Sequence, residues 1–203
     1  MPAPEPFRPI VLASASPRRR DLLAAAGIDF EVEPPPVEEP RHLAPGLTPA
    51  AQAAALAYFK ARAVAEGRPE RTVLAADTIV AAGGEVLGKP ADPDDARRML
   101  RLLSHNRHEV LTGVALLLPD GRRRVECDGT VITMRPMTDE EVEAYVASGE
   151  WIGKAGGYAI QETADRFVTA VDGSFTNVVG LPMERVERML REMGVPRNAS
   201  EGV

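Results

Sequence analysis

The sequence has very few of the residues that usually form disulfides, metal centres or covalent nucleophiles. Cys127 is the only cysteine among 203 residues, so an internal disulfide is excluded. It lies in a strand-like run, and we interpret it as an interior thiol in a reducing compartment, not as a nucleophile. The histidines, His42, His105 and His108, lack a metal-ligand spacing and are interpreted as surface or strand-start residues. No serine lies in a nucleophile-elbow pattern, so covalent catalysis is not expected.

Aromatic residues, long apolar runs and excess positive charge are scarce as well. Phe, Trp and Tyr make up 4% of the chain, which argues against a stacking platform for single-stranded nucleic acid. No apolar run approaches the roughly 20 residues of a membrane-spanning helix, and residues 1–6 lack the pattern of a signal peptide. The net charge of −6 does not favour nucleic acid or anionic membranes. We therefore expect a cytoplasmic protein that binds neither nucleic acid nor a membrane.

What the chain does contain is an alternation of strand and helix patterns, which is typical of an α/β fold. Its 44% of apolar residues suffice for one substantial core, or for one fold with two lobes. Residues 29–45 are rich in Pro and Glu and are expected to form a loop. Strands are expected at 9–13, 71–81, 109–118, 123–134 and 166–171, and helices at 18–26, 49–66, after Asp92, after the capping box at Thr138, and at 182–193.

Residues 14–20, with the sequence SASPRRR, combine a helix start with an unusual run of cations. Ser16 suits an N-cap and Pro17 suits the first helical turn. Arginines in that turn are unfavourable, because the N-terminus of a helix already carries partial positive charge. A bound anion removes this conflict, so the segment predicts a phosphate cradle between a strand and a helix. A solvated arginine cluster on a surface helix is the alternative.

Residues 83–90, with the sequence GGEVLGKP, match the spacing of a P-loop as far as Lys89. A P-loop continues with Ser or Thr, whose hydroxyl binds magnesium, whereas this chain has Pro90. The next helix also begins too late, near Pro93. We therefore reject a Walker A site but keep Lys89 as a candidate phosphate ligand.

Asp77 interrupts an apolar strand, where a buried carboxylate is costly without a partner. It is either a metal ligand or general base at a cleft, or one member of a structural ion pair. The loops at the carboxyl ends of strands form the sites of α/β sheets, which favours the first interpretation. Thr78 points to the opposite side of a regular strand, or into the cleft if the strand ends there.

Other residues suit the same site, although each is unremarkable alone. Glu38 and Glu39 lie in the Pro-rich loop, and Lys60 lies on the second predicted helix. With the candidates above they suit a polyphosphate and a divalent cation, because carboxylates bind Mg²⁺ or Mn²⁺ while Lys and Arg bind phosphate oxygens. Gln161 ends the glycine-rich run GKAGGYAIQ and can pair with the N3–H and O4 of uracil or thymine, unless this run is an ordinary turn.

Six motifs follow one another along the chain: LASASPRR, AADTIV, GKP, TGVAL, YVASGEWIGKAGGYAIQ and NVVGLP. Together, over residues 10 to about 185, they resemble the Maf family of nucleoside triphosphate pyrophosphatases. The resemblance implies an α/β fold like that of inosine triphosphatases, with an elongated mixed sheet flanked by helices and a cleft between two lobes. It also implies hydrolysis of the α–β bond of a nucleoside triphosphate, a divalent metal cation (Mg or Mn) and often a homodimer.

The resemblance also implies roles for individual residues. Asp77 matches the proton acceptor and, with Glu39, a carboxylate that holds the metal. The phosphate-binding positions match Ser14, Arg18, Arg19, Lys60 and Lys89. The positions that distinguish the branch acting on dTTP and UTP match Arg18, Thr78 and Gln161. Glu162 follows Gln161 where the family often has glycine, which we expect to affect the choice of base and not the reaction.

The resemblance leaves two alternatives open. One is the same reaction on 7-methyl-GTP or other nucleotides, and the other is a non-catalytic, nucleotide-binding regulator of septum formation. The motif YAIQ favours the pyrimidine branch, and the presence of Asp77 favours an enzyme. We expect one two-lobed domain at 9–195, between a flexible N-terminus at 1–8 and a frayed tail at 196–203.

Overall fold

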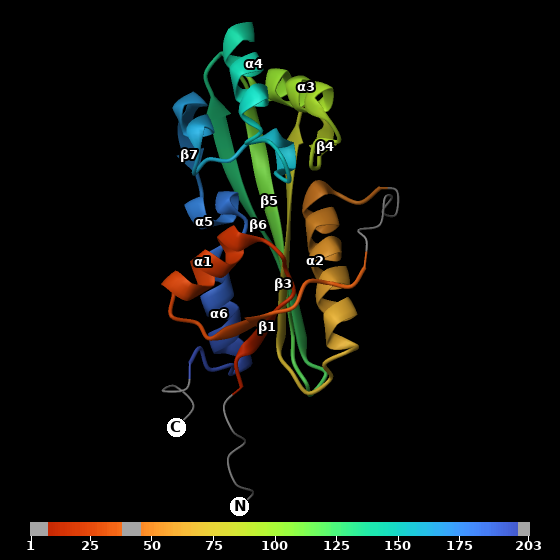
Figure 1. The fold of residues 1–203 in the computed structure, drawn as a ribbon. Helices are drawn as coiled ribbons and strands as arrows, with labels where there is room; N and C mark the ends of the chain where they lie inside the picture. The colour runs from red at the N-terminus through yellow and green to blue at the C-terminus, as the bar shows by residue number, and fades with distance from the viewer. Residues whose placement is uncertain (1–7, 38–45, 199–203) are drawn as a thin grey trace, which may run out of the picture.

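The computed structural model describes residues 8–37 and 46–198, and it contains one seven-stranded mixed sheet with helices on both faces (Figure 1). The strand order is β2-β1-β3-β5-β6-β7, and β4 pairs with β3. β1 pairs in parallel with β2 and β3, and the other pairs are antiparallel. The strands are β1 Ile10–Leu12, β2 Phe30–Val32, β3 Val73–Ala82, β4 Glu85–Leu87, β5 Arg107–Leu117, β6 Arg123–Met134 and β7 Val168–Asp172. The predicted α/β class with a mixed sheet is confirmed.

The helices begin where the sequence places capping residues. The side chains of Thr48, Asp92 and Thr138 each accept a hydrogen bond from the backbone three residues on, and Thr138 completes a capping box with Glu141. The helices are α1 Pro17–Ala25, α2 Pro49–Ala65, α3 Pro93–Leu103, α4 Asp139–Ser148, α5 Phe175–Val179 and α6 Met183–Met193, with 3₁₀ turns at Ala155–Gly157 and Thr163–Phe167.

Successive side chains of β3 pack against helices on opposite faces of the sheet. Val73 and Ala75 belong to the cluster under α2, whereas Leu74 and Ala76 belong to the cluster with α1 and α6. Figure 1 shows α2 on one side of the strands and α1 with α6 on the other. Because side chains alternate along a strand, Asp77 falls on the α2 face and Thr78 on the opposite face.

The long strands β5 and β6 join two separate parts of the core. One cluster lies between the sheet and α3 and α4, and another lies between the sheet and α1 and α6. In Figure 1 these helix pairs occupy opposite halves of the molecule. The predicted two lobes are therefore two cores on one continuous sheet.

Several short elements were not predicted. β2 lies inside the predicted loop, and it is a three-residue edge strand without a buried face, so it has no alternating pattern. β4 follows a hairpin turn at Gly83 and Gly84, whose φ angles are 58° and 81°. This hairpin occupies the segment that resembled a P-loop, which confirms its rejection. α5 has five residues and is too short to produce a helical repeat.

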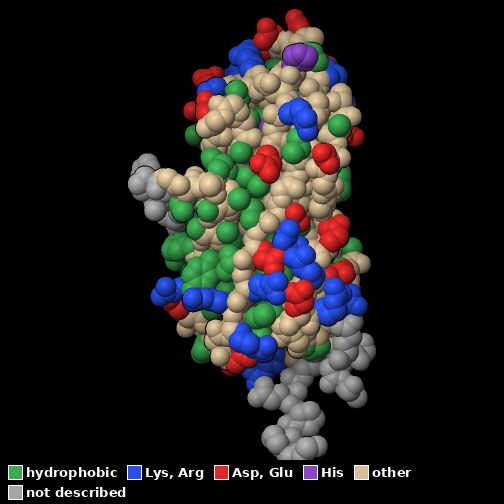
Figure 2. Space-filling view, turned by 180° about the vertical axis from the view of Figure 1, so that it is seen from behind, with side chains coloured by type: hydrophobic (Ala, Val, Ile, Leu, Met, Phe, Trp, Pro, Cys, Tyr) green, Lys and Arg blue, Asp and Glu red, His purple; other side chains and the backbone are tan. Residues whose placement is uncertain are grey.

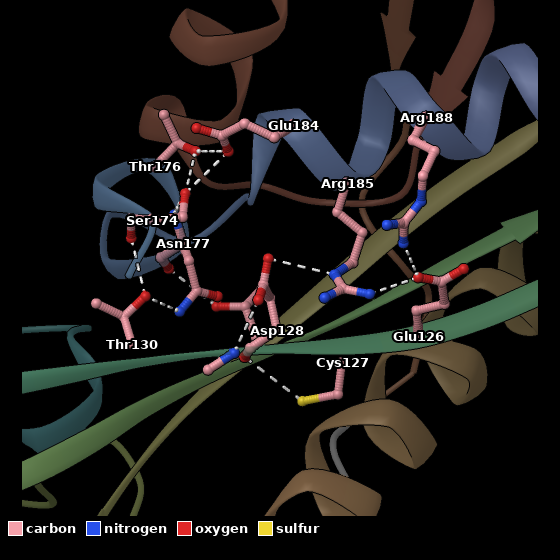
Figure 3. A network of polar contacts seen from close by, with 12 residues as sticks. Glu126, Cys127, Asp128, Thr130, Ser174, Thr176, Asn177, Glu184, Arg185 and Arg188 are labelled. Atoms are coloured by element: carbon pink, nitrogen blue, oxygen red, sulfur yellow. Dashed lines mark hydrogen bonds and ion pairs between the residues drawn. The ribbon is translucent and has the colours of Figure 1, made fainter. Parts of the chain in front are cut away.

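The rear surface carries a cluster of paired charges over α6 and β6 (Figure 2). Glu126 pairs with Arg124, Arg185 and Arg188 at 2.5 Å in each case. Figure 3 shows Arg185 and Arg188 reaching from α6 to Glu126 on β6. These arginines are balanced by carboxylates, so the cluster is not an unbalanced basic surface. Among the residues that the structure describes, no helix is both long and apolar enough to cross a membrane.

Candidate active site

The candidate site lies where the sheet has a gap beside β3. β1 pairs with β3 only at Val73 and Leu74, and β4 begins to pair at Val80. In the described ranges, no strand covers this side of residues 75–79. We expected Thr78 to reach the cleft only if its own strand ended there. Instead the neighbouring strands end, so Asp77 and Thr78 line one cavity although they lie on opposite faces.

This cavity has a volume of about 670 Å³, and residues from both halves of the molecule line it, the half with α1 and α2 and the half with α3 and α4. Seven of the predicted residues line it, namely Ser14, Arg18, Arg19, Lys60, Asp77, Thr78 and Lys89. Lys89 follows β4 at the α3 end of the sheet, whereas the others come from β3, α2 and the β1–α1 segment. The segment between α4 and β7 contributes Ile152, Lys154 and Tyr158, which the sequence reasoning did not select, and Glu162, which it expected to affect the choice of base. Lys154 and Tyr158 lie in the motif GKAGGY, so their nearness to Gln161 was the signal that could have identified them.

Arg19 ties the start of α1 to two other segments. Its Nε donates to the carbonyl of Gly180 at 2.8 Å, its Nη1 to Ser14 Oγ at 3.0 Å and its Nη2 to Thr78 Oγ1 at 3.3 Å. Ser16 occupies the N-cap position as predicted, but its side chain makes no capping bond. The planar guanidinium fork therefore positions the cavity wall as well as giving it positive charge.

Ser14 presents a proton to the cavity. Its Oγ accepts hydrogen bonds from the backbone N–H of Ser16 at 3.2 Å and from Arg19. A hydroxyl has two lone pairs and one proton, so both lone pairs are used and the O–H remains as a donor. A phosphate oxygen is a suitable acceptor for it.

The other two arginines differ in their surroundings. Arg18 lines the cavity, and its Nε is buried without a hydrogen-bond partner among the described residues. Buried polar atoms are usually hydrogen-bonded, so this nitrogen has unused donor capacity. Arg20 is exposed, so the alternative of a solvated arginine fits this residue only.

We expect Arg19→Lys to lower kcat/KM for a nucleoside triphosphate by roughly 10- to 100-fold, because an ammonium cannot make the three bonds of the guanidinium fork. Arg20→Lys is the matched control and should stay within about twofold of wild type, since exposed substitutions have small effects. Steady-state kinetics on both variants tests this. Equal activity of the two would remove Arg19 from the site.

Asp77 is nearly buried and forms an ion pair with Lys60 of α2. Its neighbour in register on β5 is Gly113, where α2 approaches the sheet so closely that an added Cβ would lie 2.2 Å from the carbonyl oxygen of Ala53. This close approach brings the helix, and with it Lys60, against the α2 face. Asp77 can therefore be a member of an ion pair and still act as a metal ligand or general base, because the ion pair lies in the cavity wall.

His108 was interpreted as a surface or strand-start residue, and the interpretation as a surface residue is wrong. It lies at the start of β5 but is only 3% exposed, and its Nε2 is 2.7 Å from the hydroxyl of Tyr158. Burial lowers the pKa of His108 from 6.5 to about 4. The neutral imidazole therefore holds Tyr158 against the cavity.

This pKa predicts a loss of stability in mild acid. The unfolded chain takes up a proton near pH 6.5 and the folded chain only near pH 4, so the free energy of unfolding falls as the pH drops between these values. At about 1.4 kcal/mol per pH unit, the total is about 3 kcal/mol. Urea unfolding from pH 7 to pH 4 should show this slope, and His108→Gln should lack it. Parallel curves for both proteins would contradict the prediction.

Comparison with known proteins identifies the family. The family model for Maf-like proteins matches residues 9–193. The chain belongs to the Maf family. A Maf relative from Moorella thermoacetica named dTTP/UTP pyrophosphatase is 48% identical over 92% of this chain and 95% of its own length. A second with the same name, from Koribacter versatilis, is 50% identical over 92% and 95%. The solved Ham1 protein of Staphylococcus aureus is 13% identical with a TM-score of 0.53 over 92% of this chain and all of its own, which shows a shared fold.

The last predicted specificity residue of this Maf protein lies differently from the others. Gln161 is exposed and is not among the described residues that line the cavity, although Ile160 and Glu162 are. Glu162 forms an ion pair with the nearly buried Lys154. Glu162 thus neutralises a cation in the cavity wall, and the role of Gln161 in base choice stays a prediction.

The residues predicted to bind a metal are only partly within the part of the chain that the structure describes. Glu39 lies outside the described residues, and within them no group of three His, Cys, Asp or Glu side chains could hold a metal ion. Mg²⁺ is usually held by one or two carboxylates together with substrate phosphates. Asp77, in a cavity that is also lined by arginine and lysine side chains able to hold phosphate, fits that donor set.

Proposed function

We propose that this Maf protein hydrolyses the α–β phosphoanhydride of dTTP and UTP, releasing the monophosphate and pyrophosphate. One observation carries the proposal: a carboxylate, two lysines, two arginines and a donating serine hydroxyl converge on a single cavity. Phosphoryl transfer depends mostly on positioning and charge stabilisation, which this set of residues supplies. The names of the 48% and 50% identical relatives support the same reaction and the same bases.

The triphosphate is bound at the start of α1. Ser14 donates its hydroxyl proton to a phosphate oxygen, and the guanidinium groups of Arg18 and Arg19 neutralise phosphate charge. Lys60 and Lys89 stabilise the negative charge that develops on the leaving pyrophosphate. The negative charge of the phosphates then balances both the arginines and the partial positive charge of the helix N-terminus. This balance accounts for the unusual run of arginines in the first turn of α1.

Asp77 acts as the general base. Its carboxylate takes a proton from the water molecule that attacks the α-phosphorus. Asp77, with Glu39, would hold the divalent cation, which when bound supplies Lewis-acid polarisation of the phosphate oxygens. Thr78 and Gln161 read the base. We place the enzyme in the cytoplasm, where its single cysteine stays reduced.

A panel of nucleoside triphosphates with Mg²⁺ or Mn²⁺, including 7-methyl-GTP and purines, tests this function by pyrophosphate release. We expect turnover to be highest with dTTP and UTP and to require the metal. Release of orthophosphate in place of pyrophosphate would contradict the bond assignment. A panel in which no triphosphate is hydrolysed would favour the non-catalytic alternative.

Gln161→Glu tests base reading within the same panel. A glutamate cannot donate to the O4 of uracil or thymine, so we expect the preference for dTTP and UTP over other nucleotides to fall by roughly tenfold. Glu143→Gln, at an exposed position of α4, should have no effect. An unchanged preference would remove Gln161 from the base pocket.

A further inference from the structure

A chain of hydrogen bonds leads from the cavity into the protein behind Thr78. The Oγ1 atoms of Thr78 and Thr112 are 3.0 Å apart, and Thr112 Oγ1 donates to the backbone carbonyl of Asn177 at 3.0 Å. Thr112 is completely buried. A carbonyl oxygen can only accept, so the single hydroxyl proton of Thr112 lies toward Asn177. The proton shared by the two threonines must therefore come from Thr78.

Thr78 is thereby left without a proton to offer. It donates to Thr112 on one side and accepts from Arg19 Nη2 at 3.3 Å on the other. One lone pair remains, and Thr78 lines the cavity. In contrast to Ser14, which can only donate further, Thr78 can only accept from a ligand.

The end of this chain is held firmly. Asn177 is fully buried, and its Nδ2 donates to the carbonyl of Val110 at 2.9 Å and to Thr130 Oγ1 at 3.0 Å. Thr130 in turn donates to the carbonyl of Ser174 at 3.0 Å. Figure 3 shows Asn177 beside Thr130, between α5 and β6. The carbonyl that accepts from Thr112 therefore cannot turn away without breaking buried hydrogen bonds.

We infer that Thr112 is a positioning residue for base selectivity, because it fixes Thr78 as a hydrogen-bond acceptor. The inference rests on the proposed function. Uracil and thymine carry an N3–H that donates to such an acceptor and leaves O4 to Gln161, whereas cytosine has a lone pair at N3. When cytosine is bound, its N3 lone pair faces the acceptor of Thr78, and neither atom can form a hydrogen bond. Leaving acceptors unpaired on binding costs free energy, which weakens the binding of cytosine nucleotides. The enzyme should thus favour UTP and dTTP over CTP and dCTP by roughly 10- to 100-fold.

Thr112→Val tests the inference, with Thr112→Ser as the matched control. Valine keeps the shape but removes the hydroxyl, so the proton of Thr78 is free to turn toward the cavity. We expect the ratio of kcat/KM for UTP to that for CTP to fall by about tenfold in Thr112→Val. Serine keeps the hydrogen bond and should preserve the ratio. A change in packing or in the folded fraction lowers both rates together and leaves this ratio unmoved.

The outcomes separate the inference from the function on which it rests. Active wild type with an unchanged ratio in Thr112→Val overturns the inference alone. Wild type that hydrolyses none of the four pyrimidine triphosphates overturns the proposed function and the inference with it. If Thr112→Val does not fold, Thr78→Val at the half-buried cavity wall removes the acceptor itself. The ratio should fall there too, and an unchanged ratio overturns the inference.

Discussion

Replacing Asp77 by Asn is expected to lower kcat for dTTP and UTP by about 10²- to 10⁴-fold. The amide cannot take a proton from the attacking water, and it is a poorer ligand for a hard cation than a carboxylate. Asparagine keeps the size of the side chain and an oxygen that can accept from Lys60. The fold should therefore survive, and the loss should appear in turnover measured by pyrophosphate release.

Asp172→Asn is the matched control. Asp172 is an exposed residue at the end of β7 and does not belong to the cavity lining. Its variant should have wild-type kinetics. Circular dichroism and the thermal midpoint of both variants exclude unfolding as the cause. Turnover of Asp77→Asn close to that of wild type would show that another group accepts the proton.

Replacing Gly113 by Ala is expected to destabilise the protein by at least about 3 kcal/mol. The added Cβ would lie 2.2 Å from the carbonyl oxygen of Ala53 and 2.5 Å from the backbone nitrogen of Ala54. These are backbone atoms of α2, so no side chain can turn aside and the whole helix must move. Lys60 lies on that helix, so activity should fall with stability.

Gly67→Ala provides the comparison for this prediction. A Cβ there would lie 3.7 Å from the nearest atom beyond its chain neighbours, the carbonyl oxygen of Val64, which is ordinary contact distance. Its free energy of unfolding in urea should stay within about 0.5 kcal/mol of wild type. Equal stability of the two variants would mean that α2 does not pack on β5 as closely as described.

The elements that could be predicted are those whose signals are local. The caps at Thr48, Asp92 and Thr138 depend on side chains that bond to the backbone three residues on, and each begins a helix as expected. The long strands β5 and β6 are recognisable as two strand-like runs on either side of the turn at 119–121. β2 and α5 are too short to carry a repeat, because they are formed by pairing and packing with distant segments.

The membership of the site was largely predictable, but its geometry was not. Charge conflict at Arg18 and Arg19, and the lone acid at Asp77, indicated chemistry before any fold was known. The burial of His108 had no signal in its own neighbourhood, because Tyr158 lies 50 residues away along the chain. The pairing of Lys154 with Glu162 likewise depends on a turn that folds the glycine-rich run back on itself.

By itself, the sequence determined which residues carry charge, where the helices begin and which family the motifs resemble, because these depend on neighbours along the chain. Only the tertiary structure decided that β1 and β4 leave a gap beside β3, and that Asp77 and Thr78 therefore share one cavity. It also decided the direction of the hydroxyl protons at Ser14 and Thr78. Each hydroxyl's partners come from separate segments, and a proton's direction depends on which neighbours can accept it.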